Sequence, residues 1–128
     1  MLSQFTPIAT LPTKDMSKAR NFYEGTLGLA VDREAMEGVS YKCGDGLILV
    51  YKSEYASTNK ATAVTFDVPM SAFEDEIRAL RDKGISFLTF ELEGVNWNQD
   101  VASMGDAAKG VWFTDPDGNI ISVAAGAM

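Results

Sequence analysis

The sequence predicts an α+β fold built from two similar halves, each with one helix and several short strands. Two observations support this prediction: a β-α-β-β-β order that occurs twice, and a well-marked β-hairpin near the end of the chain. A chain of 128 residues is long enough for one compact domain with a fair core. We therefore expect a single domain over 1–128, made of modules 1–52 and 61–128 in tandem.

The clearest element is a hairpin over residues 111–123, VWFTDPDGNIISV. Two apolar runs flank the turn, in which Pro116 sets φ and Gly118 can adopt a positive φ. We expect the carboxylates of Asp115 and Asp117 to accept hydrogen bonds from backbone N–H groups two residues further on.

The first half begins with a predicted strand over 5–13. A helix follows, capped by Asp15 and ended by Gly28, with apolar residues at three- and four-residue spacing between them. Three short strands are then expected over 29–36, 39–43 and 47–52, separated by glycine-containing turns.

The second half repeats this order after a polar linker over 53–60. A strand over 62–68 precedes a helix, in which Ser71 and Glu74 have the spacing of a capping box and Gly84 marks the end. Glu74 and Arg78 are expected to pair at i,i+4 on the helix surface. A strand over 85–92 and the hairpin complete the module, with an insert at 93–109.

The two halves share a common register. From the capping residue to the terminating glycine, both helices span thirteen positions: Asp15 to Gly28, and Ser71 to Gly84. Modules that cannot bury their sheets alone are expected to pair side by side, as one curved mixed sheet with helices outside and a cleft within.

Composition excludes several classes of function. The net charge of −7 disfavours binding to nucleic acid or to an anionic membrane surface. The absence of histidine excludes Ser-His-Asp and Cys-His catalysis and any metal site that needs an imidazole. No apolar run is long enough to span a bilayer, and the N-terminus does not resemble a secretory signal. With Cys43 as the single cysteine, these features predict a cytoplasmic protein.

Two motifs at this separation resemble a known family. The segment from Asp15 through NFYEGTLGL at 21–29 and the segment WFTDPDGN at 112–119, together with the duplication, resemble the vicinal-oxygen-chelate superfamily. That superfamily contains glyoxalases, bleomycin-resistance proteins and extradiol dioxygenases. The resemblance spans nearly the whole chain. It implies paired modules and a homodimer.

The resemblance also implies a metal held by the first and last strands of each module. The four ligand positions fall on Ile8, Leu49, Ala63 and Ser122. None of these side chains is a competent ligand, because three are hydrocarbons and a neutral hydroxyl binds metals poorly. We therefore expect no metal and no other cofactor.

Without the metal, the cleft between the modules is expected to bind a small molecule through apolar, aromatic and a few polar groups. The residues predicted to line this ligand site are Tyr41, Leu49, Tyr51, Ala63, Asp67, Trp97, Met104, Trp112 and Ser122. No catalytic residue is assigned.

The main hypothesis is a metal-independent binding protein of the bleomycin-resistance type, which holds an aromatic or cationic organic ligand in the cleft between the modules. The alternative is a glyoxalase-like lyase, isomerase or epimerase that is metal-free or uses a displaced site of carboxylates such as Asp67 or Glu91. A third hypothesis is a structural or regulatory module whose cleft is filled by its own side chains.

Overall fold

A computed structural model describes residues 1–4, 6–35 and 38–126 of the chain. The chain divides into two compact units. The first comprises Met1–Ala63 and the turn Asp115–Asn119, and the second comprises Val64–Thr114 and Ile120–Met128. Hydrogen bonds join the strands into a four-stranded and a five-stranded sheet.

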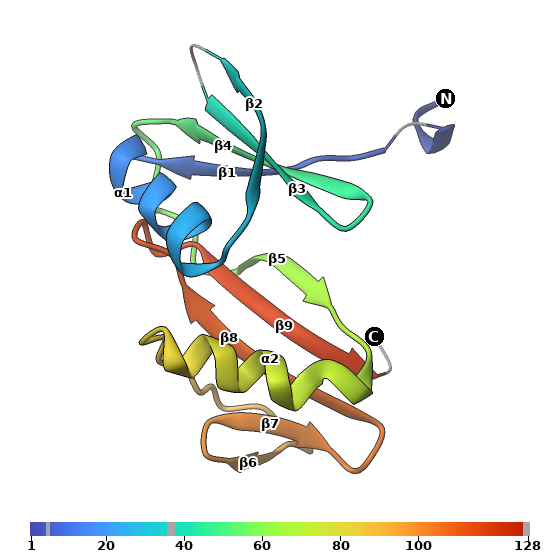
Figure 1. Ribbon diagram of the computed structural model, residues 1–128. Helices are drawn as coiled ribbons and strands as arrows, with labels where there is room; N and C mark the ends of the chain where they lie inside the picture. Colours follow the sequence, from blue (N-terminus) through green and yellow to red (C-terminus); the bar gives the residue numbers. More distant parts are fainter. Residues whose placement is uncertain (5, 36–37, 127–128) are drawn as a thin grey trace. The chain divides into compact units, whose positions relative to one another are not determined.

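The first unit has the predicted β-α-β-β-β order (Figure 1). Its elements are η1 (Leu2–Gln4), β1 (Ala9–Thr13), α1 (Met16–Arg20), the π-helical η2 (Asn21–Thr26), β2 (Ala30–Ala35), β3 (Gly38–Cys43) and β4 (Gly46–Lys52). The sheet order is β1-β4-β3-β2, with β1 parallel to β4 and the other pairs antiparallel. The first strand is shorter than expected, since it starts at Ala9. The expected strand ends at Phe5 and Met36 lie outside the described residues.

The first helix starts and ends as predicted but changes type within its length. Asp15 caps it by accepting a hydrogen bond from the Lys18 N–H at 3.2 Å, and Gly28 has the positive φ (71°) of a helix terminator. From Asn21 onward the backbone is π-helical. A regular α-helix over this whole length was therefore a wrong expectation. Segments of this kind are rare and occur mostly within or next to α-helices.

The second unit repeats the sheet order of the first and extends it. Its elements are β5 (Thr62–Asp67), α2 (Met70–Asp82), β6 (Asn96–Asn98), β7 (Val101–Met104), β8 (Ala108–Thr114) and β9 (Ile120–Gly126). The sheet order is β5-β9-β8-β7-β6, so the first four strands match β1-β4-β3-β2 and β6 is added at the edge. This correspondence confirms the α+β fold of two tandem modules.

The strand expected over 85–92 does not form. Its place beside β8 is occupied by β7, where Ala102 pairs with Gly110 and Met104 with Ala108. The Leu88 N–H still donates a hydrogen bond to the Trp112 carbonyl at 2.7 Å. The expected insert at 93–109 thus supplies the hairpin that replaces the predicted strand.

The start of α2 also differs from the expectation. Pro69 is the N-cap residue and no side chain caps the helix, because Ser71 already lies inside the first turn. Glu74 does not pair with Arg78. Glu74 is 3.6 Å from the Lys109 ammonium on β8, while Arg78 is 3.2 Å from Asp75. A partner from the sheet has replaced the local one.

Helix α2 covers one face of the second sheet (Figure 1). The face contributes the buried side chains of Val111, Phe113, Ile121 and Val123, and the helix contributes Phe73 and Ile77. Burial of such side chains is the main stabilising term of this unit.

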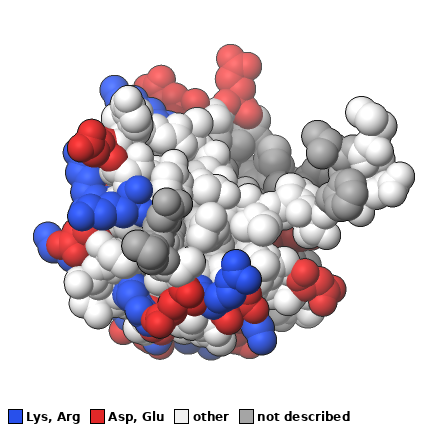
Figure 2. Space-filling view, turned by 90° about the horizontal axis from the view of Figure 1, so that it is seen from above, with Lys and Arg blue, Asp and Glu red and all other residues white. Residues whose placement is uncertain are grey.

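Charges are mixed over the surface. In Figure 2, acidic and basic side chains are interspersed around an uncharged area, with no broad patch of one sign on the face shown. Among residues 1–4, 6–35 and 38–126, no helix is long and apolar enough to cross a membrane.

Candidate functional site

The four positions at which the family resemblance implies a metal do not fit one in this chain. Ile8 precedes β1 and is 47% exposed, Leu49 lies in β4, Ala63 in β5, and the buried Ser122 in β9. Three of the four lack any donor atom. Within the described part of the chain, no group of three or more His, Cys, Asp or Glu side chains is placed to hold an ion. We derive no metal chemistry from these residues.

The candidate site lies on the face of the second sheet that α2 does not cover. Trp112 on β8 is at its centre. Its ring centroid is 6.0 Å from that of Trp97 on β6 and 5.6 Å from that of Phe90, which meets it edge-on at 88°. Aromatic pairs in this range stabilise each other beyond simple burial. We call Phe90, Trp97 and Trp112 the aromatic cluster.

Strand register places small side chains beside the aromatic cluster. Ser122 on β9 is directly opposite Trp112, and residues opposite each other in a sheet share a face. Gly110 precedes Trp112 by two positions on the same face, and a Cβ on it would lie 3.5 Å from the indole ring. Ala102 is opposite both Gly110 and Trp97. Small neighbours leave room for a large ring at Trp112.

Four of the predicted ligand-site residues meet on this face. Trp97 and Trp112 are in ring contact, Ser122 is opposite Trp112, and Met104 has the same strand alternation as Ala102. Trp97 and Trp112 are half-buried, Met104 is 54% exposed and Ser122 is buried. The aromatic rings therefore combine fixed packing with partial accessibility.

Two further predicted residues, Leu49 and Tyr51, share a face of the first sheet. Both are half-buried on β4, where Leu49 is opposite Ser40 and Tyr51 is opposite Gly38. Two remaining residues are on β5, Ala63 half-buried and Asp67 exposed.

Tyr41 does not belong with Leu49 and Tyr51. It pairs with Ile48, so it lies on the opposite face of the sheet, and it is fully buried. Its ring stacks on that of Tyr23 at 5.8 Å, and its hydroxyl donates to Glu24 at 2.9 Å. The prediction that Tyr41 lines the ligand site conflicts with this placement, because the phenol is already part of the core.

Phe90 is the site residue that sequence reasoning missed. It was expected within a strand over 85–92 and was assigned no role in the ligand site. Its ring lies beside that of Trp112, whose carbonyl accepts a hydrogen bond from the Leu88 N–H. The sequence carries no local signal for this position, because Phe90 is one of seven aromatic residues in the second half of the chain.

The DPDGN turn has a structural role. The Asp115 carboxylate accepts backbone hydrogen bonds from Asp117 and Asn119, both at 2.9 Å, and a side-chain bond from Asn119 at 2.8 Å. As predicted, Asp115 binds an N–H two residues on. Asp117 instead accepts from the Lys14 N–H at 2.9 Å, so its partner comes from the segment between β1 and α1. Both carboxylate oxygens of Asp115 are therefore engaged within the fold.

Cys43 is not an activated nucleophile. The thiol is half-buried, and burial raises its pKa above the usual value of 9.0. Since the thiolate is the reactive form, a raised pKa lowers its reactivity at neutral pH.

The comparisons agree with this fold. The profile of the Glyoxalase/Bleomycin resistance protein/Dioxygenase superfamily matches residues 4–123, and the chain belongs to this superfamily. No protein with a curated description matched the sequence.

Solved structures show the same fold at low sequence identity. A glyoxalase/bleomycin resistance protein/dioxygenase from Alicyclobacillus acidocaldarius is 14% identical with a TM-score of 0.72, and the match covers 97% of this chain and 92% of that one. A lactoylglutathione lyase from Agrobacterium tumefaciens is 19% identical with a TM-score of 0.68, and the match covers 95% of this chain and 93% of that one. The fosfomycin resistance protein FosX from Mesorhizobium loti is 12% identical with a TM-score of 0.69, and the match covers 100% of this chain and 96% of that one.

Proposed function

We propose that this protein binds a small organic ligand, aromatic or cationic, on the aromatic cluster and does so without a metal. The observation that carries the proposal is Trp112, held between Phe90 and Trp97 on the sheet face opposite α2. This is the bleomycin-resistance type of function within the superfamily, in which the ligand is held rather than transformed.

The chemistry of the aromatic cluster favours such a ligand. An indole face attracts flat aromatic rings by stacking and organic cations through its quadrupole, and tryptophan is the best of the aromatic residues for this. The net charge of −7 favours the approach of a cation over that of an anion. Ser122, opposite Trp112, adds one hydroxyl for orienting a polar group.

Isothermal titration with four probes tests the proposal. N-methylquinolinium is aromatic and cationic, quinoline is aromatic and neutral, tetramethylammonium is cationic only, and cyclohexanol is neither. We expect saturable binding that is strongest for N-methylquinolinium and absent for cyclohexanol.

Variants locate the binding. Trp112→Leu should weaken binding of N-methylquinolinium by about tenfold or more, equivalent to ~1.4 kcal/mol or more. Tyr55→Leu is the matched control, since it removes an aromatic ring that is 81% exposed on the other unit. Binding that is unchanged in Trp112→Leu, or absent for every probe, would refute the proposal.

Elemental analysis of the purified protein separates binding from metal-dependent catalysis. We expect no stoichiometric transition metal, because the family's ligand positions carry Ile8, Leu49, Ala63 and Ser122. A tightly bound stoichiometric ion would instead favour a glyoxalase-like enzyme with a displaced site.

Assembly and location complete the proposal. Members of the superfamily often form dimers. We propose a homodimer in the cytoplasm, to be checked by light scattering on a size-exclusion column and by cell fractionation. A monomer at working concentration would overturn the first part.

A further inference from the structure

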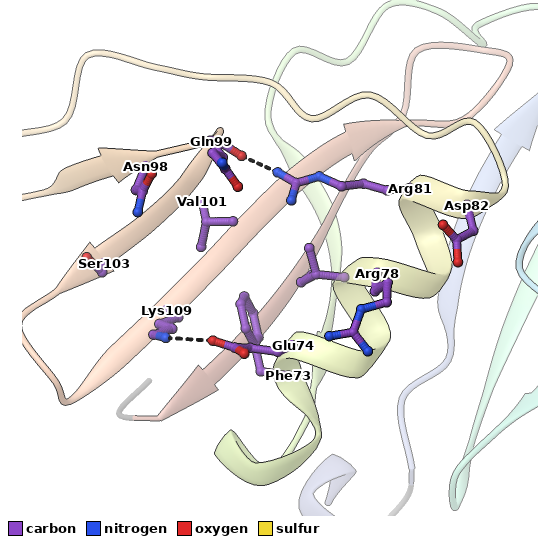
Figure 3. Close-up of a pocket in the computed structure, with 11 residues that line it drawn as sticks. Phe73, Glu74, Arg78, Arg81, Asp82, Asn98, Gln99, Val101, Ser103 and Lys109 are labelled. Carbon is purple, nitrogen blue, oxygen red and sulfur yellow. Dashed lines mark hydrogen bonds and ion pairs between the residues drawn. The ribbon is translucent and has the colours of Figure 1, made fainter.

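A groove lies on the other side of the second sheet, between α2 and the β6–β7 hairpin (Figure 3). Its volume is about 480 Å³, within the range of roughly 300–1,000 Å³ that is usual for small-molecule sites. The groove belongs entirely to the second unit. Strand alternation separates it from the aromatic cluster, because Lys109 and Val111 face α2 whereas Gly110 and Trp112 do not.

Two polar contacts link the helix to the sheet around the groove. The Arg81 guanidinium donates a hydrogen bond to the Gln99 carbonyl, and the Lys109 ammonium is 3.6 Å from the Glu74 carboxylate. Figure 3 shows both contacts reaching across from α2. Glu74 and Arg81 are two helical turns apart on one face, so the contacts are about 10 Å from each other along the axis.

The floor of the groove is apolar. Phe73 and Ile77 of α2 are buried, and Val101 of β7 is half-buried. A hydrocarbon chain or ring of a ligand would therefore find apolar side chains between the two polar contacts. Ser103 on β7 and Asn98 on β6 add neutral polar groups at the rim.

Three basic residues, Arg78, Arg81 and Lys109, line the groove together with two acidic ones, Glu74 and Asp82, and these charges are not fully paired. Lys109 has Glu74, and Arg78 has Asp75 at 3.2 Å. Arg81 has no carboxylate within ion-pair distance among the residues that the structure describes, and its guanidinium carbon is 5.1 Å from the centre of the Phe87 ring. The Gln99 carbonyl accepts a hydrogen bond from one N–H group of Arg81. The other N–H donors of the guanidinium can therefore bind an anion.

Arg81 is also held in place before any ligand arrives. Its acceptor, Gln99, has φ of 50° and the next residue, Asp100, has φ of 64°. These two residues form the tight turn between β6 and β7. Both have a positive φ, a backbone conformation that glycine adopts at lower cost than other residues. The bond from Arg81 helps to hold this strained turn, and the turn in return fixes the guanidinium. A fixed cation loses less entropy on binding than a mobile one.

We propose that this groove is a second binding site, for a small organic anion whose carboxylate or phosphate pairs with Arg81 and whose apolar body lies on Ile77 and Val101. The site goes beyond the ligand proposed for the aromatic cluster, which is aromatic or cationic and binds on the opposite face of the sheet.

A titration followed by amide NMR shifts tests the site with four hexyl probes. Hexanoate and hexyl phosphate carry the anion, while hexanol and hexylammonium have the same chain without it. We expect saturable shifts for the two anions, centred on α2 and residues 98–103, and none for hexanol or hexylammonium. The stronger of the two anions identifies the head group, and inorganic phosphate alone should bind more weakly than hexyl phosphate.

Variants separate the groove from general charge effects. Arg81→Gln should weaken hexanoate binding by about tenfold, equivalent to ~1.4 kcal/mol. Arg33→Gln, which removes an exposed arginine on β2 of the other unit, should leave it unchanged. Because Arg81→Gln also loosens the turn, Ser103→Asp provides a second test: it keeps Arg81 and adds a repelling charge to the rim, and should weaken hexanoate binding severalfold.

The site would be overturned by shifts that do not saturate, or by shifts that hexanol reproduces. Equal loss of hexanoate binding in Arg33→Gln and Arg81→Gln would overturn it as well. The result is independent of the function proposed above, since Trp112→Leu should leave hexanoate binding unchanged while it weakens binding of N-methylquinolinium.

Discussion

The Tyr23 hydroxyl donates a buried hydrogen bond of 2.7 Å to the Asp115 carboxylate, 92 positions later in the chain. Tyr23 comes from the NFYEGTLGL segment and Asp115 from the DPDGN turn, so this bond joins the two motifs that mark the family. Asn119 strengthens the link, because its side-chain amide also donates to the Pro12 carbonyl at 3.0 Å. The first unit therefore contains a turn from near the end of the chain as part of its core.

Removing that bond should cost stability. Tyr23→Phe leaves the buried Asp115 carboxylate without one charge-assisted donor, and we expect a loss of about 1.5–3 kcal/mol in the free energy of unfolding. Urea unfolding monitored by circular dichroism measures it. Tyr55→Phe, at a position that is 81% exposed, is the control and should be neutral. A loss equal to that of the control would show that the bond is unimportant.

Stability should also fall in alkali. Burial and the nearby Asp115 carboxylate raise the pKa of Tyr23 above the usual 10.0, and burial and Glu24 raise the pKa of Tyr41 in the same direction. A raised pKa in the folded state favours the neutral phenol, so this stability is fully present below pH 10 and is lost as the pH rises further. Urea midpoints between ~pH 8 and ~pH 11 should decline, and less steeply in Tyr23→Phe. Parallel declines in the two proteins would contradict this assignment.

A second pH effect is expected in acid. The hydrogen bond from Arg20 lowers the pKa of Glu24 below its usual 4.5, and the bond from Tyr41 acts in the same direction. A lowered pKa in the folded state gives stability that is present above pH 4.5 and is lost as the pH falls below it. Glu24→Gln should flatten the acid limb of the melting temperature against pH. Glu54→Gln, an exposed residue of the same unit, should leave that limb unchanged.

Gly38 should not tolerate a side chain. A Cβ at this position in β3 would lie 2.5 Å from the Val50 carbonyl oxygen of the neighbouring strand. Gly38→Ala must push the two strands apart, and we expect a loss of about 1–3 kcal/mol in unfolding free energy. Gly25→Ala is the matched control, since a Cβ there meets nothing within 4 Å. Urea unfolding of both variants would reject the prediction if Gly38→Ala were as stable as Gly25→Ala.

Local signals in the sequence were sufficient for elements whose partners are near in the chain. The Asp15 cap, the Gly28 terminator and the hairpin of β8 and β9 follow from residue types at short spacing, and the structure confirms all three. The capping box of Ser71 was wrong because Pro69 is the N-cap residue, and Glu74 lies beside Lys109 on β8 instead. The strand over 85–92 was wrong because β7, which is nearer to β8 in sequence, pairs with β8.

The candidate site could likewise be predicted from the sequence only where its residues lie on one strand. Alternation along single strands correctly grouped Leu49 with Tyr51, but it carried no information on which face Tyr41 would take in the next strand. The register between strands decides that, and it put Tyr41 into the core beside Tyr23. The contact of Phe90 with Trp112 and the groove at Arg81 could not be predicted either, because both join residues from different elements of the second unit.

By itself, the sequence determined the duplicated α+β fold, its family and the lack of ligand atoms at the family's metal positions. These depend on residue identity and on spacing within one element. The tertiary structure alone decided which side chains share a face. Pairing between strands sets that arrangement, and a shift of one residue in register moves every side chain of a strand to the opposite face.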